Sequence, residues 1–140
     1  MISLIIVTHG EFGAYLLEAA EMIVGAQTEG VDLVSISPRV SVEAARAQLA
    51  AILEKRAACG GALILTDMLG GTPTNIAFPL AQKIPASSVI SGVNLNMVLA
   101  ALSYRGRMTL ENLSLKVAED GKKSISDVKA LFDAAMKPKC

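Results

Sequence analysis

Short runs of apolar residues alternate along the chain with longer stretches in which apolar and polar residues are mixed. Four short runs cover residues 2–7, 31–36, 62–66 and 88–91. The first run is nearly continuous and rich in β-branched residues, which is typical of a strand buried on both faces. We expect a β-strand at each of the four runs.

Between these runs, apolar residues recur three or four positions apart, which predicts amphipathic helices. The first helix is expected over residues 12–24, and Ser41 is expected to cap the second. Pro73 fits the first position of the third helix with Thr72 as its N-cap, and Asn94 suits the N-cap of the fourth. The apolar positions that define these four helices are Phe12, Leu16, Ala20, Ile23 and Val24; Val42, Ala45, Leu49, Ile52 and Leu53; Ile76, Ala77, Leu80 and Ala81; and Met97, Val98, Ala101 and Leu102.

The last part of the chain leaves two interpretations open. A fifth helix is expected over residues 109–119, closing near Gly121. After it, residues 122–126 suit a short edge strand, whereas apolar residues spaced through 125–135 suit another helix. Strands that alternate with helices predict an α/β fold: a doubly wound, mainly parallel four-stranded sheet with helices on both faces, with or without an extra edge strand from the C-terminal segment.

Composition narrows the function classes. The 140 residues match one ordinary domain, which we expect to span residues 1–140. The 13 basic residues balance the 13 acidic ones, so no overall field favours nucleic acid or anionic lipid. No apolar run approaches the roughly 20 residues that a membrane span needs, and the first run lacks the basic flank of a signal peptide. We therefore expect a cytoplasmic protein with no direct membrane insertion and no nucleic-acid partner.

Candidate chemistry gathers where the predicted strands end. His9, the only histidine, follows the first strand, and Asp67 follows the third. In a parallel sheet both lie at the carboxyl edge, where doubly wound folds bind ligands. A neutral imidazole held by a carboxylate on one nitrogen presents the other as a nucleophile. The alternatives are a histidine satisfied by a backbone carbonyl and an aspartate that serves an N-cap or Asx-turn.

A glycine-rich segment, Gly70-Gly71-Thr72-Pro73, follows Asp67. It forms either a tight turn into a helix or an anion site made of bare amides, a hydroxyl and a helix N-terminus. The chain has no nucleotide-binding glycine motif, no nucleophile elbow and no zinc-ligand spacing. An activated imidazole beside an anion pocket favours phosphoryl acceptance, and we expect no cofactor and no metal.

Four motifs, spread over about the first hundred residues, match those of a known family in order and spacing. They are Val7-Thr-His-Gly10, Ala20-Glu-Met-Ile-Val-Gly25, Asp67-Met-Leu-Gly-Gly-Thr-Pro73 and Ser91-Gly-Val-Asn94. The chain thereby resembles the IIA component of the mannose/fructose/sorbose family of the phosphoenolpyruvate-dependent sugar phosphotransferase system. The resemblance implies a IIA-type phosphocarrier domain acting as a protein-histidine phosphotransferase.

The resemblance also implies a role for each residue of the site. His9 would be phosphorylated on Nε2, and Asp67 would hold Nδ1. Gly71 and Thr72 would contact the phosphoryl oxygens, within a phosphoryl-binding set that also includes Gly10 and Gly70.

By the same resemblance, a histidine-containing phosphocarrier protein donates the phosphoryl group and a separate IIB protein accepts it, because no IIB domain follows in this chain. The family also implies a homodimer. In some members a C-terminal strand is exchanged between subunits, and here that strand would lie near residues 122–126, with the tail from about 122 forming the exchanged strand and helix.

Apolar surface near the site is expected to dock the partner proteins. The candidates are Phe12, Met68, Leu69 and Asn94, with core packing the slightly favoured alternative for Phe12. The chain departs from the family at Asn96, where many members have proline, and at Met68-Leu69, where some relatives have a more aromatic pair. Both departures bear on docking rather than on the phosphorylated ring.

Three other functions stay open at this stage. One is the phosphocarrier subunit of a dihydroxyacetone kinase, against which the full Gly-Gly-Thr-Pro segment speaks. Another is a regulatory phosphoprotein without a transport role. The third is a domain that binds a small anion without forming a phosphoprotein.

Overall fold

A central sheet of four parallel strands organises the computed structural model, which describes residues 1–135. The spatial order is β2-β1-β3-β4, so β1 and β3 lie in the middle. The strands coincide with the four predicted apolar runs to within two residues at each end: β1 (Ser3–His9), β2 (Val31–Ile36), β3 (Ala62–Thr66) and β4 (Ser87–Ser91).

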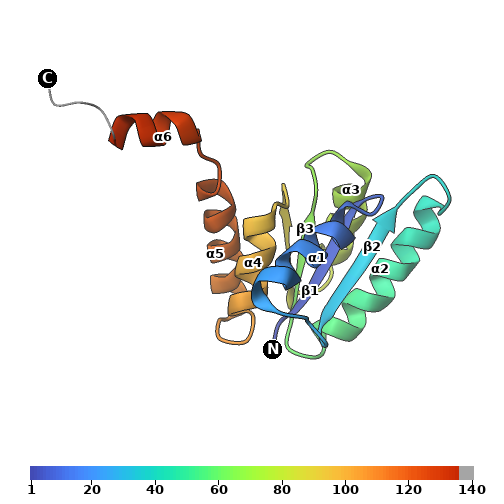
Figure 1. Ribbon diagram of the computed structural model, residues 1–140. Helices are drawn as coiled ribbons and strands as arrows, with labels where there is room; N and C mark the ends of the chain where they lie inside the picture. Colours follow the sequence, from blue (N-terminus) through green and yellow to red (C-terminus); the bar gives the residue numbers. More distant parts are fainter. Residues whose placement is uncertain (136–140) are drawn as a thin grey trace, which may run out of the picture.

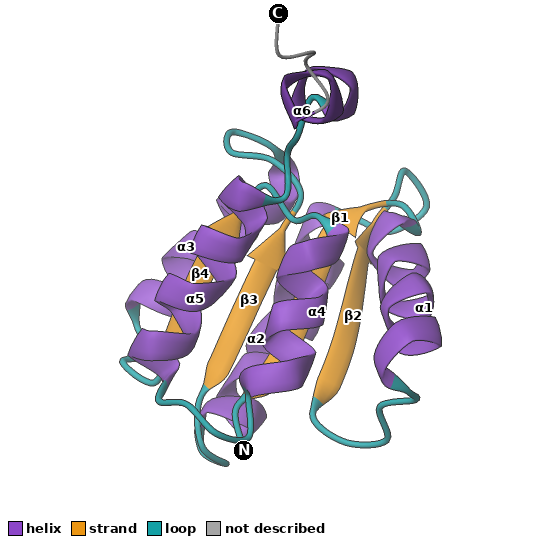
Figure 2. Ribbon diagram, turned by 60° about the vertical axis from the view of Figure 1, so that its left-hand side comes forward, coloured by secondary structure: helices purple, strands orange, loops and turns teal. Residues whose placement is uncertain are grey.

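Helices cover both faces of the sheet, as Figures 1 and 2 show. One face carries α1, α4 and α5, and the other carries α2 and α3. The predicted doubly wound α/β fold is therefore confirmed. The helices are α1 (Phe12–Val24), α2 (Val42–Ala57), α3 (Thr72–Gln82), α4 (Leu95–Tyr104), α5 (Leu110–Lys123) and α6 (Val128–Ala135).

Two cores form because alternate residues of a strand point to opposite faces of the sheet. Leu4 and Ile6 of β1 are buried in the core beneath α1, α4 and α5. Ile5 and Val7 are buried in the core beneath α2 and α3. A strand covered on both faces needs apolar residues at every position, which explains the continuous apolar run.

The helix caps agree with the sequence at two of three predicted positions. The side chains of Ser41 and Asn94 accept hydrogen bonds from backbone amides in the first turns of α2 and α4. The prediction of Thr72 as the cap of α3 is wrong, because the first helical hydrogen bond runs from the Asn75 amide to the Gly71 carbonyl at 3.0 Å. Gly71 is the N-cap.

The fifth helix, expected over residues 109–119 and closing near Gly121, continues as α5 two residues past this buried glycine, to Lys123. A Cβ at Gly121 would lie 2.5 Å from Cγ of Met97, so the missing side chain allows α4 and α5 to approach closely. Lys122 and Lys123 are therefore helical, and within residues 1–135 the segment 122–126 forms no edge strand. The alternative helix is present as α6.

The apolar residues of α1 are only partly buried. Ala20 lies in the core, whereas Phe12 is 46% exposed and Ile23 is 63% exposed. The spacing thus predicted the helix correctly but assigned too many residues to its inner face. No helix among the described residues has both the length and the apolar character required to cross a bilayer.

Candidate functional site

His9 and Asp67 meet at the carboxyl edge of the sheet, although they are 58 positions apart. His9 is the last residue of β1, and Asp67 directly follows the last residue of β3. These strands are neighbours in register, with Val7 opposite Thr66. One oxygen of Asp67, Oδ2, accepts the His9 backbone amide at 2.8 Å and lies 2.7 Å from ring atom Nδ1.

The electrostatics of this pair fix the tautomer of the ring. Burial raises the pKa of the Asp67 carboxyl, but the hydrogen bonds from the His9 amide and ring outweigh it, so the pKa lies below its ordinary value. Asp67 is then ionised at neutral pH and only accepts hydrogen bonds. Nδ1 must therefore donate its proton, which leaves the lone pair of a neutral ring on Nε2. The His9 side chain is 50% exposed, whereas that of Asp67 is 12% exposed.

The turn after His9 is held in place by hydrogen bonds to neighbouring elements. The Gly10 amide donates to the Ile36 carbonyl of β2 at 2.7 Å, so this amide is already used within the fold. The Thr8 side chain is buried, and its hydroxyl accepts the Gly13 amide of α1 at 2.8 Å. Sequence reasoning did not identify Thr8 as part of the site. Its position one residue before the candidate nucleophile was the available signal.

The loop between β3 and α3 packs against the imidazole ring. A Cβ added to Gly71 would lie 3.0 Å from Cε1 of His9 and 2.9 Å from Cγ of Met68. Gly70 has a backbone φ of +84°, which glycine adopts more easily than other residues. The two glycines therefore have different tasks: Gly70 makes the turn, and Gly71 leaves room for the ring.

The N-terminus of α3 faces the same edge of the sheet. It begins at Thr72 with no side-chain cap and no acidic residue in its first turn. The Thr72 hydroxyl makes no hydrogen bond within residues 1–135. Helix N-termini carry a partial positive charge that favours anions. The arrangement provides an uncapped helix end and a hydroxyl beside a nucleophilic nitrogen.

Several apolar side chains are exposed on the segments next to this polar centre. Leu69 is 81% exposed, Met68 is 54% exposed, and Phe12 is more exposed than core packing would allow. Asn94 differs from these three, because its side chain accepts the Met97 amide at 3.0 Å and donates to the Gly121 carbonyl at 3.2 Å. Of the four predicted docking residues, Asn94 thus has a structural task in addition to any role in docking.

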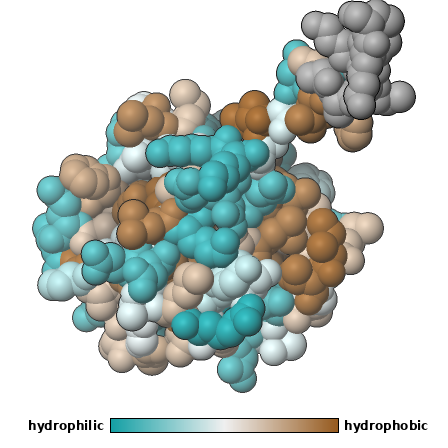
Figure 3. All heavy atoms as spheres, turned by 90° about the vertical axis from the view of Figure 1, so that its left-hand side faces the viewer, coloured by the Kyte–Doolittle hydropathy of each residue, from teal (hydrophilic) through white to brown (hydrophobic). Residues whose placement is uncertain are grey.

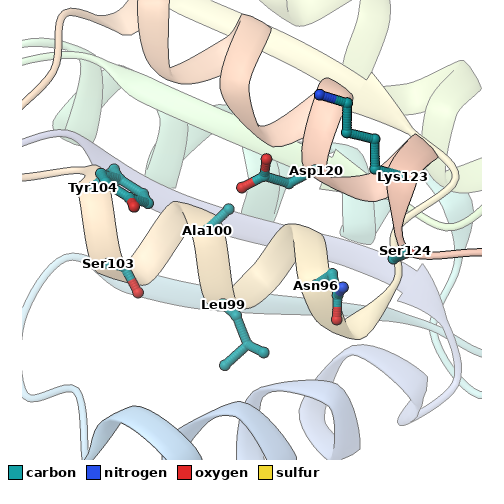
Figure 4. A pocket seen from close by; sticks show the side chains of 8 residues that line it. All are labelled: Asn96, Leu99, Ala100, Ser103, Tyr104, Asp120, Lys123 and Ser124. Atoms are coloured by element: carbon teal, nitrogen blue, oxygen red, sulfur yellow. The ribbon is translucent and has the colours of Figure 1, made fainter.

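A separate pocket of about 390 Å³ lies between α4 and α5 (Figure 4). Asn96 lies near one end and Tyr104 near the other, and Lys116 of α5 lies 4.6 Å from the Tyr104 ring centroid. The pocket shares no residue with the His9–Asp67 pair. Asn96, one of the departures noted in the sequence, therefore lies on a different surface from the His9 ring. Among residues 1–135, no group of three His, Cys, Asp or Glu side chains is arranged to hold a metal ion.

Comparison with known proteins gives one consistent result. A sequence model of the family described as the PTS system fructose IIA component matches residues 3–118. The fructose-specific EIIA component of the PTS system from Bacillus subtilis (strain 168) is 30% identical over 113 residues, which are 81% of this chain and 77% of that protein. The mannose-specific EIIAB component of the PTS system from Escherichia coli (strain K12) is 32% identical over 130 residues.

The match to the Escherichia coli protein covers 92% of this chain but only 40% of that longer relative. Among solved structures, the phosphotransferase system component EIIA from Streptococcus agalactiae has a TM-score of 0.85 and 32% sequence identity. That alignment covers 93% of this chain and 99% of the Streptococcus protein. The likeness therefore extends over nearly the whole of a IIA-sized chain.

Proposed function

The chain belongs to the family of fructose IIA components of the sugar phosphotransferase system (PTS), and on that premise we propose that His9 carries the phosphoryl group. In this proposal the chain accepts the group from a histidine-containing phosphocarrier protein and passes it to a IIB protein. The observation that carries the proposal is the contact of 2.7 Å between Nδ1 of His9 and Oδ2 of Asp67. In a neutral ring this contact leaves the lone pair on Nε2, and the His9 side chain is 50% exposed.

The phosphoryl transfer follows from this geometry. The lone pair on Nε2 attacks the phosphorus of the donor's phosphohistidine, and a new nitrogen–phosphorus bond forms. The bond between phosphorus and the donor's ring nitrogen breaks, and that nitrogen keeps the electron pair. Nδ1 of His9 keeps its proton throughout, and the Asp67 carboxylate offsets the positive charge that the ring gains. Onward transfer repeats these steps with a group of the IIB protein as the nucleophile.

Charge on the three phosphoryl oxygens needs donors, because such transfer depends mainly on positioning and electrostatic stabilisation. We assign this task to the N-terminus of α3 and to the Thr72 hydroxyl. The amides of Gly10 and Gly71 are less suited, since the first donates to Ile36 and the second donates to the Met68 carbonyl at 3.3 Å. The exposed Met68 and Leu69 side chains then dock the partner proteins around the phosphoryl group.

The proposed assembly is a homodimer. Strand β4 has β3 on one side and no partner on the other within residues 1–135. A pocket of about 570 Å³, lined in part by Leu69, Phe78 and Val89, lies beside this open edge. Helix α6 projects from the body (Figure 1). Its apolar side chains Val128, Leu131 and Phe132 are exposed, and Figure 3 shows hydrophobic residues (brown) on that projection. We propose that the C-terminal segment of a second copy covers β4.

The phosphocarrier role is tested by intact mass after incubation with phosphoenolpyruvate, enzyme I and the phosphocarrier protein. The expected result is the gain of one acid-labile phosphoryl group, which His9→Ala loses. Glu54→Gln, an exposed change on α2, serves as the control and is expected to be phosphorylated like the original chain. No gain with a verified phosphorylated donor contradicts the proposal. A stable phosphoprotein that passes its group to no IIB protein favours a regulatory role instead.

A further inference from the structure

Two buried threonine hydroxyls lie beneath the loop that contacts His9. Thr66 is the last residue of β3 and is fully buried, and Thr74 in the first turn of α3 is 8% exposed. Their Oγ1 atoms are 2.7 Å apart. The Thr74 hydroxyl is also 2.7 Å from the backbone carbonyl of Met68. Among residues 1–135 neither threonine is hydrogen-bonded to the ring, and neither has a task in the transfer described above.

The direction of these hydrogen bonds follows from proton counting. A carbonyl oxygen only accepts, so the single hydroxyl proton of Thr74 is donated to Met68. The Thr74 oxygen must then accept, and Thr66 is the donor at the other contact. The result is one chain of hydrogen bonds from Thr66 through Thr74 to the Met68 carbonyl. Such chains strengthen each of their members inside a protein.

The Met68 carbonyl is the centre of the turn that faces the ring. It also accepts the Gly71 amide at 3.3 Å, which closes a four-residue turn with Gly70 at the position that needs a positive φ. Asp67 precedes this turn and holds Nδ1 of His9. Gly71 ends the turn and lies against Cε1. The Thr74 hydroxyl therefore holds the segment whose two ends, Asp67 and Gly71, lie beside the ring.

We propose that Thr74 is a positioning residue for phosphoryl transfer, acting through Asp67 and Gly71 on the orientation of the His9 ring. Thr66 supports it by occupying the lone pair of the Thr74 oxygen. This inference rests on the proposed function, since it concerns the rate at which His9 accepts the phosphoryl group. A misplacement of about 1 Å is enough to slow an enzymatic step strongly.

The test compares Thr74→Val, which keeps the shape and removes the hydroxyl, with Thr74→Ser, which keeps the hydroxyl. For Thr74→Val we expect the rate constant of phosphorylation at saturating donor to fall about tenfold, with the donor concentration for half-maximal rate nearly unchanged. Thr74→Ser should stay within about twofold of the original chain. Thr66→Val should have an intermediate effect, because the bond from Thr74 to Met68 survives.

A second measurement reports on the ring without any phosphoryl transfer. In protein labelled with ¹⁵N at histidine, the Nδ1–H proton should give a resolved resonance protected from exchange by Asp67. Thr74→Val should broaden or lose it, and Thr74→Ser should retain it. If Thr74→Val folds, keeps this resonance and is phosphorylated at the original rate, the inference is overturned.

The two proposals fail in different ways. If the original chain is never phosphorylated, the proposed function fails, and the resonance alone still decides whether Thr74 orients the ring. If the original chain is phosphorylated and Thr74→Ser is as slow as Thr74→Val, the hydroxyl is not what matters and the inference fails alone.

Discussion

Asp67 reaches His9 twice through one carboxylate oxygen, because the backbone amide and ring nitrogen of His9 both lie within 2.8 Å of Oδ2. These two bonds tie the direction of the ring to the position of the strand end. A side chain that holds both the backbone and the ring orients the nucleophile more firmly than a contact with the ring alone.

The lowered pKa of Asp67 predicts a pH dependence of stability. Burial raises this pKa, but the hydrogen bonds from His9 outweigh it. Since the pKa is lower in the folded chain than in the unfolded chain, the stabilisation is fully present above the ordinary value of 3.8 and is lost as pH falls through the folded pKa. Urea unfolding at a series of pH values should show this loss.

The matched variant for this prediction is Asp67→Asn, which keeps the shape and cannot titrate. Below pH 3.8 its free energy of unfolding should fall less steeply with pH than that of the original chain. Parallel curves for the two proteins would contradict the assigned pKa direction.

The two adjacent glycines allow a contrast between stability and function. Gly71→Ala brings a Cβ within 3.0 Å of His9 Cε1 at an ordinary backbone conformation, so it should slow phosphorylation about tenfold with little loss of stability. Gly70→Ala places no atom near the ring but forces alanine to a φ of +84°, so it should lower the free energy of unfolding by about 1–2 kcal/mol. Phosphorylation rates and urea unfolding, measured on both variants, check the contrast.

At the scale of secondary-structure elements, Asn94 joins two helices. Its side chain caps α4 and also donates to the Gly121 carbonyl of α5. Asn94→Ala should therefore lower the free energy of unfolding by about 1–2 kcal/mol. Asn96→Ala, an exposed change two positions along the chain in α4, should stay within about 0.5 kcal/mol. If urea unfolding shows the same loss in free energy of unfolding for both variants, the proposed stabilisation by the Asn94 side chain is contradicted.

At the scale of the whole molecule, the two ends of the sheet have different roles. The carboxyl ends carry the candidate site. At the opposite end, the buried guanidinium of Arg105 donates to the carbonyls of Glu29 and Gly30, about 75 positions away, and joins the start of β2 to the end of α4. Burial lowers the pKa of Arg105. Arg105 thus ties elements together at the end of the sheet opposite the candidate site.

The proposed homodimer makes a prediction at this scale. Sedimentation should give a particle of twice the 14.6 kDa chain mass. Leu131→Asp, on the apolar face of α6, should shift it to a single chain, because a charge there cannot be buried against a second copy. Lys129→Asp, a polar position on the same helix, should leave the dimer intact. A single chain in the original protein would overturn the proposed dimer.

Much of the fold was predictable because its signals are local. Apolar runs located all four strands, and helical spacing located the first four helices in their observed places. The differences between prediction and structure lie at two helix ends. Helix α5 runs two residues past Gly121, which packs against Met97 of α4. Thr72 is not the cap of α3, because the Gly71 carbonyl accepts the first helical bond.

For the candidate site, too, some features were predictable from the sequence and others were not. The order of residues along the chain was enough to predict the α/β architecture and the polar residues at the strand ends, since periodicity and capping depend on neighbouring residues. It also brought His9 and Asp67 to one edge, once the strands were taken as parallel. Three contacts could be seen only in the folded chain: Oδ2 of Asp67 with Nδ1 of His9, Gly71 with the ring, and Thr66 with Thr74 beneath the loop. Those contacts depend on strand order and register, which bring together residues that are far apart in the chain.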